Sequence, residues 1–158
     1  MIEQQNEIKF IPYNDRYHVD LKRLTLEWIE KYLYVEPEDE EFMENPQGYI
    51  LDGGGFIFMA EYNGEVVGTV SLCKLPENKF ELCKLAVTEK YKGLKLGRHL
   101  MQLAIDKCVE INATQIILYT TKRLEAAYKL YLQLGFVEIV QEHQKYIEAE
   151  VKMVLDLK

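Results

Sequence analysis

Apolar residues along the chain form short runs, which predict strands, and stripes at helical spacing, which predict helices. The predicted strands cover residues 8–11, 56–62, 65–75, 80–87, 114–120, 136–141 and 152–157. One predicted helix follows Val19, a second begins at Pro37, and two more cover residues 96–110 and 124–134. Asn63 and Gly64 are a strong signal for a two-residue hairpin, so the strands on either side of them should pair antiparallel.

The order of these elements indicates the fold class. It is one strand, two helices, a three-strand meander, a helix, a strand, a helix and a terminal hairpin. This order predicts an α/β fold of the mixed α+β type, with a central, mostly antiparallel sheet and helices on both faces. Because 158 residues normally make one domain, we interpret residues 1–158 as a single domain.

Composition and charge exclude several classes of protein. The formal net charge of −7 argues against a dedicated nucleic-acid-binding protein, since phosphate backbones need a broad basic surface. No apolar run approaches the ~20 residues of a membrane span, and the first ten residues lack a signal-peptide pattern. We interpret Cys73, Cys83 and Cys108 as reduced thiols of a cytoplasmic protein, although Cys73 and Cys83 could flank one hairpin and form a disulfide.

The segment from Phe80 to Arg98 joins an apolar strand, a turn with two glycines and the start of a helix. Backbone N–H groups at a helix N-terminus have no intrahelical partner and lie at the positive end of the dipole. Four cations and no acid lie in its second half: Lys90, Lys92, Lys95 and Arg98. The segment therefore predicts a site for an anion such as phosphate, with an ordinary strand–turn–helix as the alternative.

This segment resembles the pyrophosphate loop of the GCN5-related N-acetyltransferase (GNAT) family, whose pattern is approximately Arg/Gln-x-x-Gly-x-Gly/Ala. Lys92 stands at the first position and Gly97 at the last. The chain departs from the pattern at Lys95, which replaces the usual middle glycine.

Residues 114–137 resemble a second family segment, a strand followed by a helix that ends in A-x-x-L-Y-x-x-x-G-F. The matching residues are Ala127, Leu130, Tyr131, Gly135 and Phe136. An asparagine often stands three residues before that alanine, where this chain has Leu124. Related subgroups place an asparagine nearer the strand end, where this chain has Thr121.

The resemblance implies the acyl-CoA N-acyltransferase fold, in which two central strands splay apart and acetyl-CoA lies in the gap. Backbone groups of one strand would pair with the pantetheine arm, and amides of the following turn would hold the pyrophosphate. The implied cofactor-binding residues are Leu85, Ala86, Val87, Lys92, Gly93, Leu94, Lys95, Leu96, Gly97, Arg98, Thr121 and Tyr128. Tyr128 has core packing as its alternative role. No metal is expected, because the three histidines lack ligand spacing.

Two residues are candidates for proton transfer. The resemblance implies that Tyr131 is the general acid, since a phenol with a pKa near ~10 is protonated at neutral pH. A half-buried core tyrosine is the alternative. Glu81 is the candidate base because a carboxylate in an apolar strand needs a partner or a function. Its alternative is a structural ion pair with Lys79 or another cation.

The implied activity is transfer of an acetyl group from acetyl-CoA to a primary amine by direct attack in a ternary complex. The acceptor would be a small-molecule or peptide amine, and a homodimer is consistent with the terminal strand. The acid-rich second helix is either a solvated face or part of a site for a basic acceptor. The alternatives are an acyl-CoA-binding sensor without catalysis and an enzyme acting on charged tRNA, against which the acidic pI of about 5.1 argues.

Overall fold

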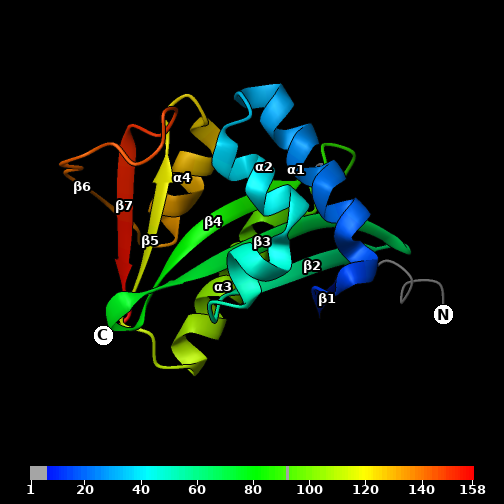
Figure 1. Cartoon of the computed structure of the whole chain (residues 1–158), viewed down its shortest axis with the longest axis horizontal. Coiled ribbons are helices and arrows are strands. Elements are labelled where there is room, and N and C mark those ends of the chain that lie inside the picture. The colour runs from blue at the N-terminus through cyan, green and yellow to red at the C-terminus, as the bar shows by residue number, and fades with distance from the viewer. Residues whose placement is uncertain (1–6, 92) are drawn as a thin grey trace.

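The computed structural model describes residues 7–91 and 93–158 and consists of a seven-stranded sheet with helices on both faces (Figure 1). The strands are β1 (Lys9–Pro12), β2 (Phe56–Tyr62), β3 (Glu65–Leu75), β4 (Lys79–Val87), β5 (Gln115–Thr120), β6 (Val137–Ile139) and β7 (Val151–Asp156). Their order is β1-β2-β3-β4-β5-β7-β6, and every pair is antiparallel except β4 with β5. The predicted fold class is confirmed.

The helices also occur where the apolar stripes predict them. They are α1 (His18–Tyr32), α2 (Pro37–Glu44), α3 (Leu96–Glu110) and α4 (Glu125–Gln133). Short helical turns add η2 (Asp15–Tyr17), η3 (Gln47–Leu51) and η4 (Pro76–Asn78). Gly135 has a φ of 101° just after α4, a left-handed conformation that glycine adopts readily.

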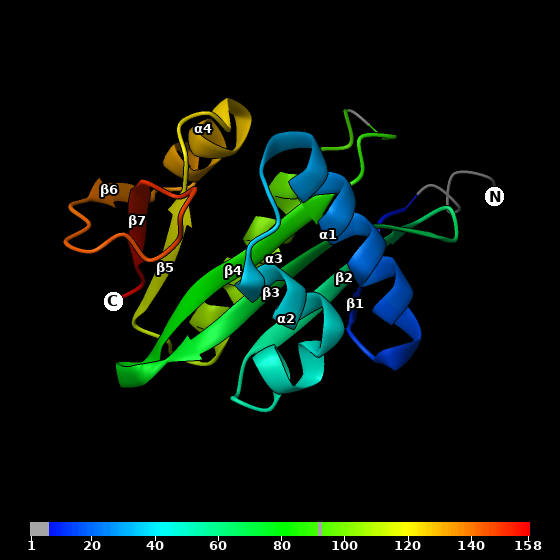
Figure 2. The ribbon, with the colours of Figure 1, turned by 45° about the horizontal axis from the view of Figure 1, so that its top comes forward.

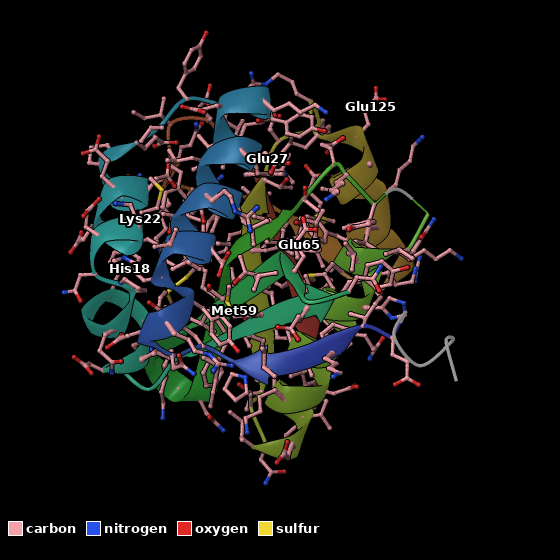
Figure 3. The ribbon with its side chains drawn as sticks, turned by 90° about the vertical axis from the view of Figure 1, so that its right-hand side faces the viewer. His18, Lys22, Glu27, Met59, Glu65 and Glu125 are labelled. Carbon is pink, nitrogen blue, oxygen red and sulfur yellow. A yellow bond between two sulfur atoms is a disulfide. The ribbon has the colours of Figure 1, made fainter. Side chains whose placement is uncertain are left out.

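Two hydrophobic cores lie on opposite faces of the sheet. Helices α1 and α2 cover one face, where Leu21, Phe42 and Met59 are fully buried (Figures 2 and 3). Helix α3 covers the other face, where Leu100 and Phe80 belong to the larger core. Both faces are therefore apolar, which explains why the central strands read as nearly continuous hydrophobic runs.

Strands β4 and β5 separate partway along their length. They pair in parallel from Lys79–Gln115 to Leu82–Leu118, but β4 continues to Val87 and β5 to Thr120. The separation begins at a β-bulge, because Ser71 and Leu72 of β3 face Lys84 and Leu82 and leave Cys83 as the extra residue. The splay implied by the family resemblance is present at this point.

The structure corrects the interpretation of the cysteines. Cys73 of β3 and Cys83 at the bulge form a disulfide, with their Cα atoms 6.2 Å apart. The expectation of three reduced thiols is therefore wrong for this pair, because antiparallel strands bring the two side chains to bonding distance across the ladder. Cys108 is a free and buried thiol, as predicted.

Candidate active site

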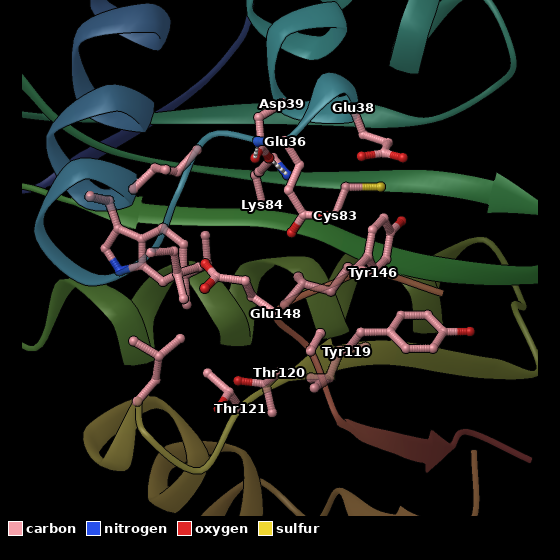
Figure 4. A pocket seen from close by; sticks show the side chains of 18 of the residues that line it. Glu36, Glu38, Asp39, Cys83, Lys84, Tyr119, Thr120, Thr121, Tyr146 and Glu148 are labelled. Carbon is pink, nitrogen blue, oxygen red and sulfur yellow. Dashed lines mark hydrogen bonds and ion pairs between the residues drawn. The ribbon is translucent and has the colours of Figure 1, made fainter. Parts of the chain in front are cut away.

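A cavity of about 100 Å³ opens where β4 and β5 separate (Figure 4). Its walls come from α1, the start of α2, both splayed strands, α4 and the loop between β6 and β7. The lining residues are Trp28, Ile29, Leu33, Glu36, Glu38, Asp39, Glu81, Leu82, Cys83, Lys84, Leu85, Leu118, Tyr119, Thr120, Thr121, Leu124, Tyr131, Tyr146, Glu148 and Ala149. We call this space the acidic cavity, because five of its lining residues are carboxylates and one is a lysine.

A second cavity of about 250 Å³ adjoins it toward the start of α3 and α4. Its lining residues are Trp28, Tyr32, Leu85, Val87, Glu89, Gly97, Arg123, Leu124, Glu125, Ala126, Ala127, Leu130 and Tyr131. We call this space the helix-start cavity. The two cavities share four residues: Trp28, Leu85, Leu124 and Tyr131. A ligand in each would therefore approach the other at Tyr131.

Tyr131, the candidate general acid, lies at the junction of the two cavities. Its side chain is 7% exposed, and burial raises the pKa of its phenol above the ordinary value of 10.0. Its ring contacts Phe136, with 6.0 Å between centroids. Among the residues that the structure describes, none hydrogen-bonds to its hydroxyl, so this group is available to a ligand.

Glu81 is buried, with 3% of its surface exposed, and its two carboxylate oxygens have different partners. Lys145 forms an ion pair with Oε1, and the Tyr146 hydroxyl donates to Oε2 over 2.6 Å. Burial, followed by the charge of Glu81, raises the pKa of Tyr146. The alternative of a structural ion pair is confirmed, but its cation is Lys145 and not Lys79, which pairs with Glu77 at 3.7 Å.

The backbone of β4 beyond the bulge offers unpaired groups to a ligand. Leu85, Ala86 and Val87 pair with β3 on one edge. Within residues 7–91 and 93–158, no strand pairs with their other edge, which faces the gap toward β5. The side chains of Leu85 and Val87 line the helix-start cavity, whereas Ala86 is buried beneath α1 and α2.

The predicted anion loop leads directly into α3. Gly93 has a φ of 89°, and Lys95, at the N-cap of α3, has φ 56° and ψ 40°. This left-handed conformation explains why the family pattern has a glycine at the position that Lys95 occupies. Gly97 lines the helix-start cavity. Lys92 lies outside the described residues.

The remaining residues of this loop lie around α3 rather than in either cavity. Leu96 is buried in the large core, and Leu94 packs against it. Arg98 hydrogen-bonds to Gln133 of α4, which connects the two helices. Their side chains therefore serve packing and helix contacts, and a ligand would meet this loop through backbone N–H groups.

Thr121 and Tyr128 have different surroundings. Thr121 is 1% exposed, lines the acidic cavity and donates to Glu150 over 3.2 Å. Tyr128 lines neither cavity, and its hydroxyl donates to Glu138 over 2.9 Å. Leu124, where the family often has asparagine, lies at the boundary of both cavities.

Two loops meet over the acidic cavity. The Tyr34 amide donates to Glu148 over 2.8 Å, and the Ile147 amide donates to Glu36 over 3.1 Å. These bonds join the loop between α1 and α2 to the loop between β6 and β7. Glu38 and Asp39 of α2 line the cavity, so this helix is not just a solvated face.

The carboxylates of α2 differ in their partners. Lys84 forms an ion pair with Asp39 at 2.5 Å (Figure 4). Glu38 has one buried oxygen without a hydrogen-bond partner among the described residues. Among the aromatic residues near the end of α1, Trp28 and Tyr32 line the cavities, but Tyr34 is 78% exposed.

Sequence reasoning missed four residues of this site: Tyr119, Lys145, Tyr146 and Glu148. Three of them lie in the loop between β6 and β7, which has no apolar periodicity and no motif. Tyr119 belongs to an apolar strand, where a tyrosine is indistinguishable from core packing. The sequence carried no signal that would place these residues beside Glu81.

A metal site and a membrane-spanning helix are both absent from the described residues. Within the described ranges, no three His, Cys, Asp or Glu side chains lie together in a way that could hold a metal ion. In the same part of the chain, no helix has the length and apolar character needed to cross a membrane.

A sheet that splits between two parallel strands, with a glycine-containing turn and a helix start at the split, is the architecture of acyl-CoA N-acyltransferases. Comparison with known proteins gives the family: the model of the acetyltransferase (GNAT) family matches residues 21–136. The chain therefore belongs to the GNAT family of acetyltransferases.

The individual relatives named here are 27–29% identical to this chain. An acetyltransferase of the GNAT family from Staphylococcus aureus Mu50 has a TM-score of 0.87 at 28% identity, over 96% of this chain and 100% of that one. The uncharacterized N-acetyltransferase YjgM of Escherichia coli K12 is 27% identical over 80% of this chain and 76% of its own length. Mouse N-acetylaspartate synthetase is 29% identical over 73% of this chain. The match covers 37% of that synthetase, so this chain spans a minor part of it.

Proposed function

We propose that this chain transfers an acetyl group from acetyl-CoA to a primary amine by direct attack in a ternary complex. The observation that carries the proposal is the meeting of two cavities at Tyr131, with unpaired β4 backbone and a helix start on one side and buried carboxylates on the other. One cavity would hold the donor and the other the acceptor.

The helix-start cavity fits the donor. An extended arm can pair with the free edge of Leu85 and Val87 as an added strand does. The pyrophosphate can accept hydrogen bonds from the N-terminal amides of α3, near Gly97, where the helix dipole favours negative charge. Two solved structures with the same fold support this fit: PaiA N-acetyltransferase of Thermoplasma acidophilum in complex with coenzyme A, and YncA of Salmonella typhimurium with acetyl-CoA.

Acetyl-CoA supplies an activated acetyl thioester, and the chain supplies positioning and proton transfer. Holding both reactants in line lowers the barrier by several kcal/mol, up to ~7–11 in ideal cases. A free N–H of β4 near Leu85 would polarise the thioester carbonyl. Glu81 would accept the proton of the acceptor ammonium, directly or through water. As the nitrogen–carbon bond forms and the carbon–sulfur bond breaks, Tyr131 would donate its proton to the departing thiolate. The second proton that the nitrogen loses on becoming an amide would restore the Tyr131 hydroxyl.

The acceptor side favours a cationic amine. The acidic cavity is lined by five carboxylates but only one lysine, so it would repel an anionic acceptor. The carboxylates are those of Glu36, Glu38, Asp39, Glu81 and Glu148. A free amine of a small molecule or a peptide fits this charge. A homodimer and a cytoplasmic location stay predictions.

A non-catalytic acyl-CoA sensor is the second candidate function. The observation in its favour is that both carboxylate oxygens of Glu81 already have partners in the chain itself. A sensor would bind CoA and release none from acetyl-CoA in the presence of any amine.

Two measurements test the proposal. Calorimetric titration of CoA should show binding to the wild type and loss of binding in Gly97→Glu, which places a carboxylate in the helix-start cavity. Gly53→Glu is the matched control, since Gly53 is exposed and has space for a side chain. A thiol reagent should then detect CoA release with at least one member of an amine panel. Binding without release would favour the sensor, and no binding would contradict both functions.

A further inference from the structure

The ammonium group of Lys145 has three neighbours that recognise a cation. It forms an ion pair with the buried carboxylate of Glu81. It also lies 5.4 Å from the ring centroid of Tyr119 and 5.3 Å from that of Tyr146. A carboxylate combined with two aromatic rings is the chemistry by which proteins bind alkylammonium groups.

These three neighbours are preorganised around the ammonium. The Tyr119 and Tyr146 rings contact each other at 5.4 Å in an edge-to-face arrangement. The Tyr146 hydroxyl holds the second oxygen of Glu81 over 2.6 Å, which fixes the carboxylate. The group therefore comes from three separate elements: β4, β5 and the loop between β6 and β7.

The cation-binding groups belong to the acidic cavity, but the cation does not. Glu81, Tyr119 and Tyr146 all line the cavity, as Figure 4 shows for the two tyrosines. Lys145 is absent from its lining, and its side chain is 43% exposed. Lys145 therefore reaches the carboxylate from the solvent side, on a loop that no helix or strand includes.

We infer that Glu81, Tyr119 and Tyr146 form an alkylammonium subsite that Lys145 occupies in the free chain and that the acceptor ammonium takes over. The inference rests on the proposed function for the identity of the acceptor. A buried carboxylate without a cation is costly, so the site needs one in both states. Exchange of one ammonium for another keeps that charge balance, and the departing Lys145 becomes solvated.

The consequence is competition. Each amine that binds must displace Lys145, so the apparent affinity for the amine is reduced by the stability of the internal pair. Removing the Lys145 ammonium should tighten amine binding by about two- to fivefold, because partly exposed ion pairs are weak. A merely structural role for Lys145 predicts the opposite sign, since the subsite would lose its shape.

The test is calorimetric titration of n-butylammonium chloride into the protein alone, without CoA. Lys145→Met should bind this probe about two- to fivefold more tightly than the wild type. Lys152→Met is the matched control, because Lys152 also lies over the Tyr119 ring, at 5.8 Å, but makes no ion pair with Glu81. It should bind like the wild type, and the neutral probe n-butanol should not distinguish the variants.

A second substitution keeps the test decisive if Lys145→Met does not fold. Lys145→Gln removes the charge and keeps a hydrogen-bond donor, and it should show the same gain. Adding Glu81→Gln to either Lys145 variant should abolish the tighter binding of n-butylammonium. Equal or weaker n-butylammonium binding in the Lys145 variants would overturn the inference. An amine panel without CoA release would overturn the proposed transfer and leave the subsite standing.

Discussion

Replacing Tyr131 by Phe removes one oxygen atom at the junction of the two cavities. Among the described residues nothing hydrogen-bonds to this hydroxyl, so the substitution breaks no protein contact. The free energy of unfolding should therefore change by less than about 1 kcal/mol. A general acid contributes about 10²–10⁴ to a rate, so kcat should fall by that factor, or about 3–5 kcal/mol in the barrier.

The assay is CoA release with the best amine of the panel, combined with calorimetric CoA titration and thermal unfolding. Tyr13→Phe is the matched control. Tyr13 is also a buried tyrosine, 8% exposed, whose pKa burial raises, but it lies in the core beneath α1 and α2. It should leave kcat and CoA affinity unchanged.

The combination of results matters more than any single value. A kcat for Tyr131→Phe within about threefold of the wild type, with CoA affinity kept, would refute its role as the acid. A fall in kcat that follows a fall in stability would show that the hydroxyl supports the fold instead.

Three further predictions concern other parts of the chain. Lys95→Gly should raise Tm by about 2 °C. Lys95 has a left-handed conformation, and the free energy of its strain exceeds the conformational-entropy cost of fixing a glycine there. A lower Tm in a thermal melting curve would contradict this. Native protein should expose no thiol to a chromogenic reagent at pH 8 and one after denaturation, because burial raises the pKa of Cys108 to about 11 and Cys73 is bonded to Cys83. Burial raises the pKa of Tyr131, and the proposed acid is its protonated form, so loss of this proton should not lower kcat between about pH 8 and 10. A fall in kcat over that range that Tyr131→Phe removes would contradict this prediction.

Much of the fold could be predicted from local patterns. The hairpin at Asn63 and the helix start at Pro37 are local signals, and both occur where the sequence predicts them. The shift of β1 by one residue, so that it includes Pro12, is permitted because β1 is an edge strand. Boundaries of this kind depend on neighbouring strands, which a local pattern does not contain.

The parts of the candidate site that one strand and its following helix position could be predicted from the sequence. The parts that a distant loop contributes could not. The positions of Gly97 and Tyr131 follow from motifs within single strand–helix units. The ion pair of Glu81 with Lys145 joins residues 64 positions apart in the sequence, and no motif around Lys145 predicts it. The disulfide is an intermediate case, because the hairpin was visible but the bulge that brings Cys83 to Cys73 was not.

The topology explains why the two cavities, the proposed donor and acceptor sites, meet at one place. Strands β4 and β5 are parallel and joined through α3, so α3 starts at the carboxyl end of β4 and α4 starts at the carboxyl end of β5. Both helix starts therefore lie at the edge where the strands separate, which brings Gly97 and Leu124 together around one gap. Tyr131 lies two turns into α4 and faces this gap, while Glu81 lies on the paired side of the bulge. The bulge at Cys83 thus sets the position of Glu81, the proposed base, relative to Tyr131, the proposed acid. Deleting Cys83 should therefore disrupt catalysis more than CoA binding.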